Sequence, residues 1–298
     1  MAGALPPPTR ASIVIVTRDR RAELRAALES ATTQRGAPEI LVMDDASTDG
    51  TAEMVQAEFP AVRLVRSDAP RGYIAQRNHA AGLATGDVIV SLDDDARFSS
   101  PDTVATTLAE FGDPRVGAVA MPFVHTHRSP DLLQLAPSLD GVWITNAYIG
   151  TAHAVRRELF LRLGGYREAL GHYFEEPDLC IRLMRSGSAV RLGRAEPILH
   201  HESARRNQAR GIAYLSRNHV LFTWFHVPFP ACVPRFLGVV AYALAWGLRS
   251  REPVAAVKGL RAGLRYVAGH PGERTPVTPG DYRRWRSLRR RPELLAEG

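Results

Sequence analysis

Three consecutive carboxylates, Asp93–Asp95, directly follow the mostly apolar segment Val88–Leu92. Like charges at the end of a buried strand repel one another unless a cation or a polar ligand offsets them. Because residues i and i+2 of an extended segment point the same way, Asp93 and Asp95 can face one site while Asp94 points elsewhere. Hard oxygen ligands in this pattern suit a divalent metal that also binds a diphosphate. A polar turn that caps the next helix is the alternative interpretation.

A second acidic segment, VMDDASTDGT at residues 42–51, ends another apolar run. A carboxylate at a strand end, such as that of Asp45, can accept a hydrogen bond from the ring N–H of uracil or thymine. The segment is also rich in residues that cap helices, so a plain strand–turn–helix junction explains it as well.

Two further groups suit catalysis or metal binding. Glu175, Glu176 and Asp178 crowd the start of a predicted helix, where the helix dipole favours negative charge and capping is a sufficient explanation. A glutamate at the mouth of a site can also act as a general base toward an alcohol. His200 and His201 follow an apolar run and are either structural histidines or metal ligands.

The first 112 residues alternate between apolar runs and segments with apolar residues at helical spacing. The runs are apolar on both faces, which predicts a parallel sheet covered by helices. The predicted strands are 12–16, 39–43, 62–66 and 88–92, and the predicted helices include 22–34 and 74–86.

In such sheets, ligands bind beyond the carboxyl ends of the strands. Thr17, Asp45 and Asp93–Asp95 all stand just past predicted strand ends. We therefore expect them to converge on one rim of the sheet, although they lie far apart in the sequence.

The order of these segments along the chain is more informative than any one of them. The set reads SIVIVTRDR, EILVMDDASTDGT, RGYIAQRNHAAGLATGDVIVSLDDDA, GGYREALGHYFEEPDLCIRLMRSG and ILHHES. Over residues 11–205 it resembles the inverting glycosyltransferases of family 2. The resemblance implies a GT-A fold, a Rossmann-like, mixed but mostly parallel sheet flanked by helices. It also implies a nucleotide-sugar donor and a divalent metal, Mg²⁺ or Mn²⁺.

Roles for individual residues follow from the positions that match the family's motifs. Glu176 falls on the catalytic base, with Glu175 as the second choice because this chain has a Glu-Glu pair. The metal ligands implied are Asp93, Asp95 and His200, with His201 as the competing histidine. The nucleotide-binding residues implied are Thr17, Asp45, Arg71, Arg77, Asp93 and Asp94.

The chemistry of the leaving group predicts the mechanism. A metal on Asp95 would neutralise the diphosphate as it departs. Glu176 would take the acceptor proton while the acceptor oxygen attacks the anomeric carbon from the opposite face, so the anomeric centre is inverted. The two carboxylates should then lie several ångströms apart, on either side of a sugar ring.

The predicted organisation has three parts. Residues 1–10 form a flexible N-terminus, residues 11–205 a catalytic domain, and residues 206–298 a basic helical C-terminal extension. Within the catalytic domain, residues 11–112 are expected to bind the nucleotide and residues 113–205 the acceptor.

Charge is unevenly distributed along the chain. The formal net charge is +7, but residues 1–199 carry 21 arginines against 25 acids, whereas residues 200–298 carry 17 basic residues against 6 acids. The extension mixes apolar stretches with Arg249, Lys258 and Arg265, a pattern that suits helices on an anionic membrane. A helix pair with solvated arginines is the alternative. No recognisable nucleic-acid-binding motif accompanies the basic residues, so nucleic acid is not an expected partner.

The expected protein is therefore a cytoplasmic, metal-dependent glycosyltransferase, either free or peripheral on the inner face of the membrane. Two cysteines suit a reducing compartment, and neither a secretory signal nor a membrane-spanning run is visible. The donor is expected to be a UDP- or dTDP-sugar, and the acceptor a hydroxyl on a glycan, a lipid-linked saccharide or a specialised metabolite. Candidate acceptor contacts are Trp143, Tyr148 and His153, with core packing as the alternative for Trp143.

Two other functions compete with this one. A sugar nucleotidylyltransferase would carry a glycine-rich basic loop after the first strand, whereas TRDRRAEL contains no glycine. A catalytically degenerate, membrane-associated scaffold would have no need of Asp45, Asp95 and Glu176, which are all present.

Overall fold

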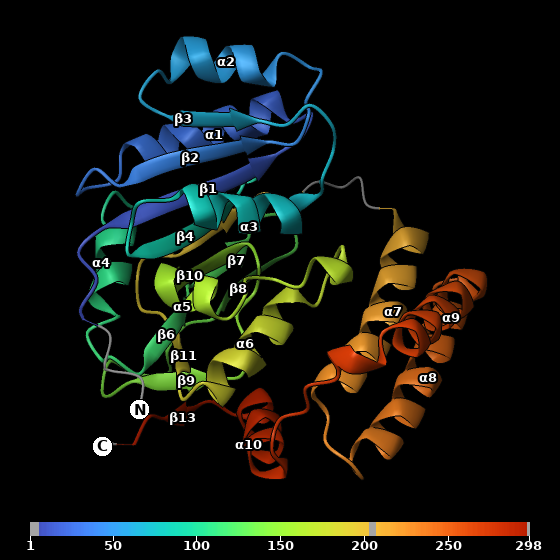
Figure 1. Ribbon diagram of the computed structural model, residues 1–298. Helices are drawn as coiled ribbons and strands as arrows, with labels where there is room; N and C mark the ends of the chain where they lie inside the picture. The colour runs from blue at the N-terminus through green and yellow to red at the C-terminus, as the bar shows by residue number, and fades with distance from the viewer. Residues whose placement is uncertain (1–5, 203–206, 297–298) are drawn as a thin grey trace.

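The computed structural model describes residues 6–202 and 207–296. They form an α/β unit and a group of carboxyl-terminal helices beside it (Figure 1). The α/β unit contains one large sheet and one small sheet. This architecture confirms the predicted class, a mostly parallel sheet flanked by helices with a helical extension.

The described residues place nine strands in the large sheet. Two of its parallel stretches are joined by one strand, β10, which runs antiparallel to both of its neighbours, β4 and β6. The predicted strands β1 to β4 pair in parallel, in the order β4-β1-β2-β3. In spatial order the strands are β13 (Glu293–Leu294), β9 (Trp143–Thr145), β11 (Ala189–Leu192), β6 (Val116–Ala120), β10 (Ala152–Arg156), β4 (Val88–Asp93), β1 (Ala11–Thr17), β2 (Glu39–Asp44) and β3 (Arg63–Arg66).

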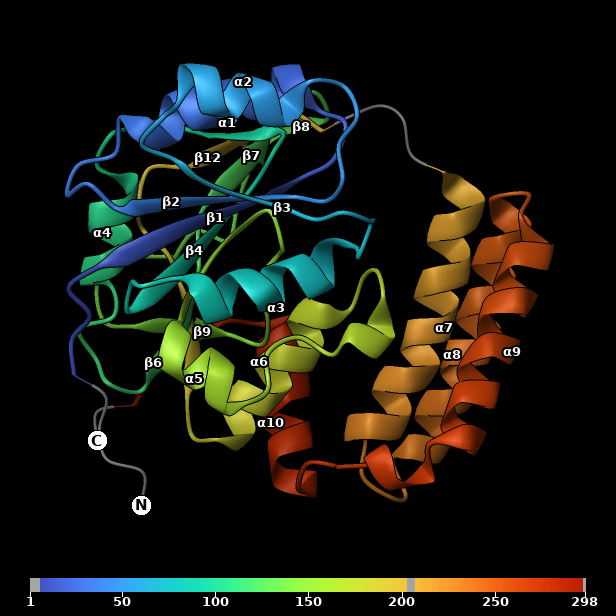
Figure 2. The ribbon, with the colours of Figure 1, turned by 45° about the horizontal axis from the view of Figure 1, so that its top comes forward.

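Helices cover both faces of this sheet (Figure 2), as the apolar character of the strands requires. Alternate residues of β1 show the division, because Ile13 and Ile15 lie in one core cluster and Val14 lies in the other. The first cluster packs against α1 (Arg21–Thr32), α2 (Thr51–Glu58) and α4 (Thr103–Ala109). The second packs against α3 (Tyr73–Leu83), α5 (Arg157–Arg162) and α6 (Glu175–Arg185), with the short helix η1 (Glu168–Leu170) nearby.

The small sheet brings two distant motifs together. Its strands, in order, are β5 (Ala96–Phe98), β12 (Ile198–His200), β7 (Phe123–His125) and β8 (Ser129–Leu133). β12 runs antiparallel to β5, with His200 opposite Ala96. The histidine pair therefore lies beside the end of the three-aspartate segment, a neighbour relation that periodicity alone did not predict.

The carboxyl-terminal helices are α7 (Gln208–His226), α8 (Cys232–Arg249), α9 (Pro253–Gly269), the short η2 (Pro271–Glu273) and α10 (Pro279–Arg290). Helix α9 approaches α7 closely, because a Cβ at Gly259 would lie 2.2 Å from the Ala213 carbonyl oxygen. None of the described helices combines the length and the apolar character needed to cross a membrane.

A buried ionic cluster ties the extension to the α/β unit. Asp178 of α6 contacts His226 of α7 at 2.6 Å, Arg182 at 2.6 Å and Arg167 at 3.1 Å. Burial alone would raise the pKa of Asp178, but the nearby Arg182, the hydrogen bond with His226 and the charge of Arg167 outweigh burial and hold it at about 2. In the described contacts the Asp178 carboxylate bonds to side chains of Arg182, His226 and Arg167, so Asp178 joins two parts of the fold and the predicted capping bond is not seen. After α10, β13 pairs with β9, so the extension also ends as a strand of the large sheet.

Two predicted boundaries fall partly outside the described residues. Residues 1–5 of the predicted flexible N-terminus and the boundary at residue 205 are not described. Within the described part, the backbone N–H groups of Thr9 and Arg10 donate hydrogen bonds to Asp87, which attach this segment to the residue directly before β4.

Candidate active site

The carboxyl ends of β1, β2 and β4 form an acidic rim, as expected for a parallel sheet of this kind. Thr17, the last residue of β1, donates a hydrogen bond from its hydroxyl to Asp94 at 2.9 Å. The backbone N–H of Asp45 donates to the Thr17 carbonyl at 2.9 Å. Residues predicted from three separate motifs therefore lie together at one edge of the sheet.

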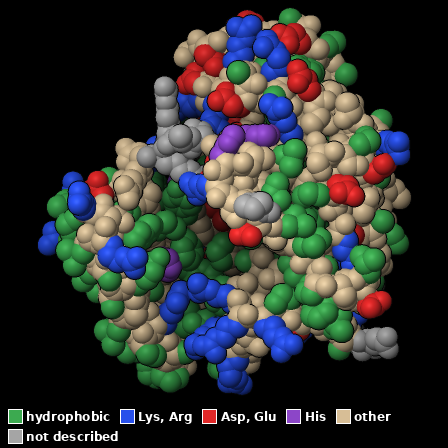
Figure 3. Space-filling view, turned by 180° about the vertical axis from the view of Figure 1, so that it is seen from behind, with side chains coloured by type: hydrophobic (Ala, Val, Ile, Leu, Met, Phe, Trp, Pro, Cys, Tyr) green, Lys and Arg blue, Asp and Glu red, His purple; other side chains and the backbone are tan. Residues whose placement is uncertain are grey.

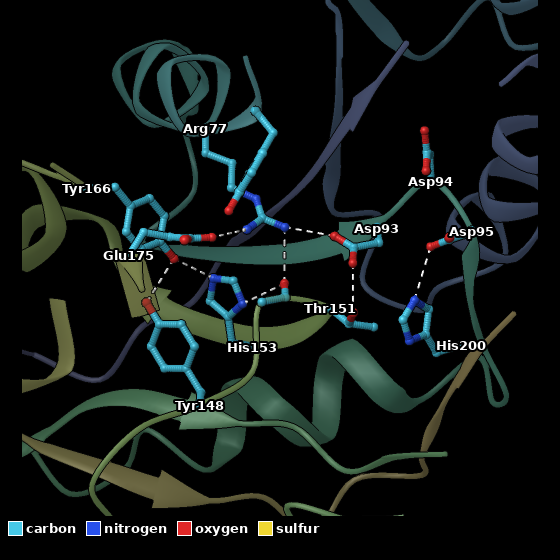
Figure 4. Close-up of polar contacts among 12 residues, drawn as sticks. Arg77, Asp93, Asp94, Asp95, Tyr148, Thr151, His153, Tyr166, Glu175 and His200 are labelled. Carbon is cyan, nitrogen blue, oxygen red and sulfur yellow. Dashed lines mark hydrogen bonds and ion pairs between the residues drawn. The ribbon is translucent and has the colours of Figure 1, made fainter. Parts of the chain in front are cut away.

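Asp93, Asp95 and His200 form a compact group of possible metal ligands. One ligand atom from each lies within 4.8 Å of the others. The His200 ring contacts Asp95 at 3.2 Å from Nε2 to Oδ1 (Figure 4). Two carboxylates and one imidazole are donors that a divalent ion such as Mn²⁺ accepts. The residues present therefore fit the metal that the sequence resemblance implies.

The second histidine lies differently. The His201 ring contacts the Thr126 hydroxyl at 2.9 Å, while its backbone N–H donates to the Asp95 carbonyl. The geometry thus favours His200 over His201 as a ligand. On its other side, His200 contacts His125 at 3.1 Å between the two Nδ1 atoms, and His125, His200 and Glu202 make a second group with ligand spacing.

Arg20 sets the charge balance of the rim. Its Nη1 donates to Asp94 and to Asp95, each at 2.8 Å. Burial alone would raise the pKa of Asp95, but hydrogen bonds from His200 and Arg20 outweigh burial and hold that pKa well below its usual value. Burial raises the pKa of Asp94 to about 7, with Arg20 offsetting part of the effect. Of Asp94 and Asp95, Asp95 is therefore the carboxylate that stays ionised more readily.

The glutamate pair begins α6 after a turn in an uncommon conformation. Tyr173 and Phe174 have φ values of 66° and 74°, which place two successive non-glycine residues in the left-handed region. Observed strain of this kind gathers at sites where the surrounding structure fixes a side chain. Here Tyr73 fixes the turn from outside, because its hydroxyl accepts the Tyr173 N–H at 2.9 Å. The turn leads into α6, whose first residue, Glu175, lies beside Arg77.

Both glutamates have perturbed acidity. Glu175 is 1% exposed, and burial raises its pKa while Arg77 opposes the shift. Burial and then the neighbouring Glu175 raise the pKa of Glu176 to about 8. A carboxylate with this pKa is well matched to proton abstraction near neutral pH.

Arg77 connects the glutamate pair to the acidic rim (Figure 4). Its Nη2 donates to Asp93 at 2.8 Å and to the Gly150 carbonyl at 3.1 Å. Its Nη1 lies 3.8 Å from Glu175, and Thr151 donates a hydrogen bond to the other oxygen of Asp93 at 2.7 Å. The two acidic groups are therefore parts of one site. Arg77 is buried among these groups, so it neutralises protein carboxylates here and does not stand open to a phosphate.

The Glu176 carboxylate lies close to the backbone of Gly150. A Cβ built on Gly150 would be 2.5 Å from Glu176 Oε1 and 3.2 Å from Arg77 Nη1. Only glycine leaves the room that this carboxylate occupies, and the displaced atom would be the end of a flexible side chain.

The Gly150→Ala substitution is therefore expected to displace the Glu176 carboxylate while leaving the fold intact. Misplacement of a reacting group by about 1 Å lowers rates on the order of 100-fold. We expect kcat for release of nucleoside diphosphate to fall by about that factor, with little change in donor affinity. Gly82→Ala is the matched control, because nothing lies within 4 Å of a Cβ at that position. Equal rates for the two variants would show that Glu176 does not act from this position.

Asp45, the predicted base-binding residue, is held by three donors. The backbone N–H groups of Arg71 and Gly72 donate at 2.7 and 3.0 Å, and the Gln76 amide donates at 2.7 Å. Burial alone would raise the pKa of Asp45, but these donors lower it. Arg71 thus touches the site through its backbone, while its side chain is exposed.

The predicted acceptor residues lie away from open surface. His153 is 0% exposed and Tyr148 3% exposed, and their rings stack at 4.1 Å between centroids. Tyr166 bonds both, at 2.8 Å to His153 Nε2 and 2.8 Å to the Tyr148 hydroxyl. In this arrangement neither can contact an acceptor, although His153 Nδ1 supports the Gly150 carbonyl at 3.1 Å. Trp143 is partly buried and reaches Ser138 at 3.1 Å.

Four of the residues that contact this site are not predicted from the sequence. Arg20 and Thr151 contact the aspartates, Gln76 contacts Asp45, and Tyr73 contacts the turn before Glu175. Arg20 had a usable signal, since a basic residue just past the first strand end faces the same rim as the acids. The others stand within helices or irregular segments and carry no such signal.

A Rossmann-like sheet with an acidic, histidine-bearing rim and a glutamate pair across Arg77 places the chain among sugar-transferring enzymes built on the GT-A scaffold. The family model described as Glycosyl transferase family 2 matches residues 12–164, and the chain belongs to that family. The structure and this match confirm the resemblance noted in the sequence.

Individual relatives extend the comparison. Uncharacterized protein y4gI from Sinorhizobium fredii is 28% identical over 225 residues, which cover 65% of this chain and 25% of that protein. This chain therefore matches only about a quarter of that relative's length. The N-acetylglucosaminyl-diphospho-decaprenol L-rhamnosyltransferase of Mycobacterium tuberculosis is 26% identical over 270 residues, covering 76% of this chain and 84% of that protein.

Among solved structures, mannosyltransferase PcManGT from Pyrobaculum calidifontis, in complex with GDP-Man and Mn²⁺, has a similar fold. The TM-score is 0.60 at 23% sequence identity, with 97% of this chain and 86% of that chain covered. At this identity the likeness shows the shared fold.

Proposed function

We propose that this glycosyltransferase moves a sugar from a nucleoside diphosphate sugar to an acceptor hydroxyl with inversion of the anomeric centre. The observation that carries the proposal is the Arg77 bridge, which joins Asp93 of the acidic rim to Glu175 of the glutamate pair. A single site then offers both a diphosphate-binding end and a proton-accepting end.

The diphosphate end consists of Asp93, Asp95 and His200. A divalent ion bound there would supply positive charge to the departing diphosphate. The imidazole in the set favours Mn²⁺ over Mg²⁺, because Mg²⁺ prefers a shell of oxygen ligands only. The solved mannosyltransferase described above also contains Mn²⁺. Arg20 keeps Asp95 ionised and oriented toward His200.

The proton-accepting end is Glu176. In its carboxylate form, it takes the proton of the acceptor hydroxyl as the oxygen attacks the anomeric carbon on the face away from the diphosphate. Glu175 stays paired with Arg77, so it is the less available of the two carboxylates. Its negative charge raises the pKa of Glu176 and makes Glu176 a stronger base.

The donor is proposed to be a UDP- or dTDP-sugar. Asp45, directly after β2, is proposed to accept a hydrogen bond from the ring N–H of a pyrimidine base. A guanine nucleotide is the competing choice, because the similar mannosyltransferase structure contains GDP-Man.

The acceptor is proposed to be a saccharide under construction, either glycan or lipid-linked, or a small metabolite. The name of the Mycobacterium tuberculosis relative includes N-acetylglucosamine linked to diphospho-decaprenol, which supports the lipid-linked choice. With such an acceptor, we propose a role in polysaccharide biosynthesis. The location is proposed to be cytoplasmic, because the proposed donor is a nucleotide sugar.

A ligand panel tests this function directly. We expect a UDP- or dTDP-sugar with Mn²⁺, at about 100 times its dissociation constant, to raise the melting temperature by about 5 °C. GDP-sugars and nucleotide sugars without metal should raise it less, and Asp45→Ala should remove the preference for pyrimidines. Formation of pyrophosphate from a sugar phosphate and a nucleoside triphosphate would instead identify a nucleotidylyltransferase. Absence of binding by every nucleotide sugar would favour the scaffold alternative.

A further inference from the structure

Helix α8 carries a continuous apolar face that no described residue covers. Between Val233 and Leu248, every exposed residue of the helix is apolar, a tyrosine or a glycine. Leu237 is 65% exposed and Leu248 is 67% exposed. This apolar α8 face consists of Val233, Pro234, Leu237, Gly238, Ala241, Tyr242, Leu244, Ala245 and Leu248.

The opposite side of α8 packs against α7 and α9 in the helix bundle. Val239 and Ala243 are buried with residues of α7 and α9, and a Cβ at Gly247 would lie 2.8 Å from Ala256. The apolar α8 face is therefore not needed to hold the bundle together. Isolated exposed leucines are ordinary on a protein surface, but a contiguous apolar patch marks an interaction site.

Basic side chains lie near the apolar α8 face, on α9 and at the carboxyl-terminal end of α8. On α9, Lys258, Arg261 and Arg265 are exposed at spacings of three and four residues, which aligns them on one side of that helix. Arg249 is the last residue of α8 and Arg251 follows shortly after it, and Glu252 is the only acidic residue in the sequence from 227 to 270. Figure 3 shows the hydrophobic surface of the helices with basic side chains at its margins.

The same surface borders a hollow between the helices and the α/β unit (Figure 3). His219 of α7 connects the two sides, with its ring 5.6 Å from Tyr242 and 4.4 Å from Phe174 between centroids. Phe174 is the residue directly before the glutamate pair. The apolar α8 face thus continues, through aromatic contacts, to the turn that positions Glu176.

We propose that the apolar α8 face seats in the interfacial layer of an anionic lipid bilayer, with Lys258, Arg261 and Arg265 at the headgroups. An apolar stripe beside a basic stripe is the arrangement of helices that lie in a membrane interface. Charge argues against a second copy of the chain as the occupant, because two such basic surfaces would repel. The inference concerns where the enzyme works, and it goes beyond the transfer reaction proposed above.

Vesicle flotation of the full chain tests the proposal. We expect binding to vesicles of equal parts phosphatidylglycerol and phosphatidylcholine, and much weaker binding to pure phosphatidylcholine. The Leu237→Gln/Leu248→Gln variant should bind anionic vesicles more weakly than the parent, by a factor of at least about 10. Arg261→Gln/Arg265→Gln should lose about five-fold per residue on anionic vesicles, and added salt should weaken the parent in the same way.

Matched controls separate the surface from general effects of charge and apolarity. Arg35→Gln/Arg162→Gln removes the same charge from the α/β unit, and Leu139→Gln/Leu161→Gln removes two leucines that are 78% and 41% exposed there. Both controls should bind vesicles as the parent does. All variants change exposed positions, and an unchanged thermal shift with nucleotide sugar verifies their fold. Failure of that shift in the parent would count against the proposed donor without affecting the vesicle result.

Three outcomes overturn the proposal. The first is no flotation of the parent chain with anionic vesicles. The second is an equal loss of binding by the control variants. The third is a concentration-dependent dimer in light scattering that Leu237→Gln/Leu248→Gln abolishes while vesicle binding is unchanged, which would assign the apolar α8 face to a second copy.

Discussion

Replacement of Glu176 by glutamine is expected to lower kcat by about 10²- to 10⁴-fold, the range that general acid–base catalysis contributes. Glutamine keeps the size of the side chain but cannot accept the acceptor proton. Donor affinity should change little, because the metal-ligand group and Asp45 are untouched. The measurement is the rate of nucleoside diphosphate release at saturating donor, with binding followed separately.

Glu175→Gln is the informative comparison. Glu175 is paired with Arg77, so its loss should perturb the site through Arg77 and Asp93 and raise the donor KM as well as lower kcat. If Glu175→Gln abolishes turnover while Glu176→Gln retains it, the two glutamates exchange roles.

The pH dependence gives a second signature of the same residue. The pKa of Glu176 is raised to about 8, mainly by burial and then by Glu175. Since the base acts in its ionised form, kcat/KM should rise with pH up to about 8 and then level off. Glu176→Gln should lack this limb.

The same raised pKa has a consequence for stability. The folded state holds the Glu176 proton more tightly than the unfolded state, so the parent loses stability as pH rises from the unfolded pKa of 4.5 to about 8. The variant cannot ionise there. Without metal or donor, it should therefore gain stability relative to the parent over this pH range, as measured by the denaturant midpoint.

Replacement of Asp95 by alanine is expected to lower kcat/KM by about 10³-fold, because charge stabilisation by a bound metal is worth several kcal/mol in the transition state. The variant also leaves Arg20 and His200 without a shared partner. Calorimetry should show loss of Mn²⁺-dependent binding of nucleoside diphosphate, a readout that does not depend on turnover.

Asp102→Asn is the control for Asp95, since Asp102 is an aspartate at the start of α4 whose only described ion pair is with Arg35. Retention of metal-dependent nucleotide binding in Asp95→Ala would remove Asp95 from the ligand set and leave Asp93 and His200 as the residues to test.

The first half of the fold was predictable because its signals are local. β1 and β4 are apolar on both faces, and their helices show regular spacing, so both the parallel sheet and the convergence of Thr17, Asp45 and Asp93–Asp95 followed from general rules. The pairing of β2 with β3 followed in the same way.

The second half depends on contacts that span long stretches of chain. β10 is inserted antiparallel between β4 and β6, and its residues AHAVR carry no pattern that sets this direction. His200 reaches Asp95 only because β12 pairs with β5 across about a hundred residues of sequence. Gly150 matters because it has no side chain, which leaves room for the Glu176 carboxylate. Hydrophobic periodicity in the sequence cannot show such a contact.

The sequence predicts the helical and basic character of the tail but not the strand β13. β13 consists of two residues, too few to form a recognisable pattern, and its place is set by its partner β9.

That short strand gives the extension a second point of attachment. The helices leave the α/β unit after β12, contact it through His226 and Asp178, and rejoin its sheet at β13. Attachment at two points restrains the extension from swinging about a single hinge, and this limits changes in the distance between α8 and Glu176. With α8 resting on a bilayer, Glu176 would lie at a set height above the membrane. The enzyme would then select acceptors by the distance between their lipid anchor and the hydroxyl that receives the sugar.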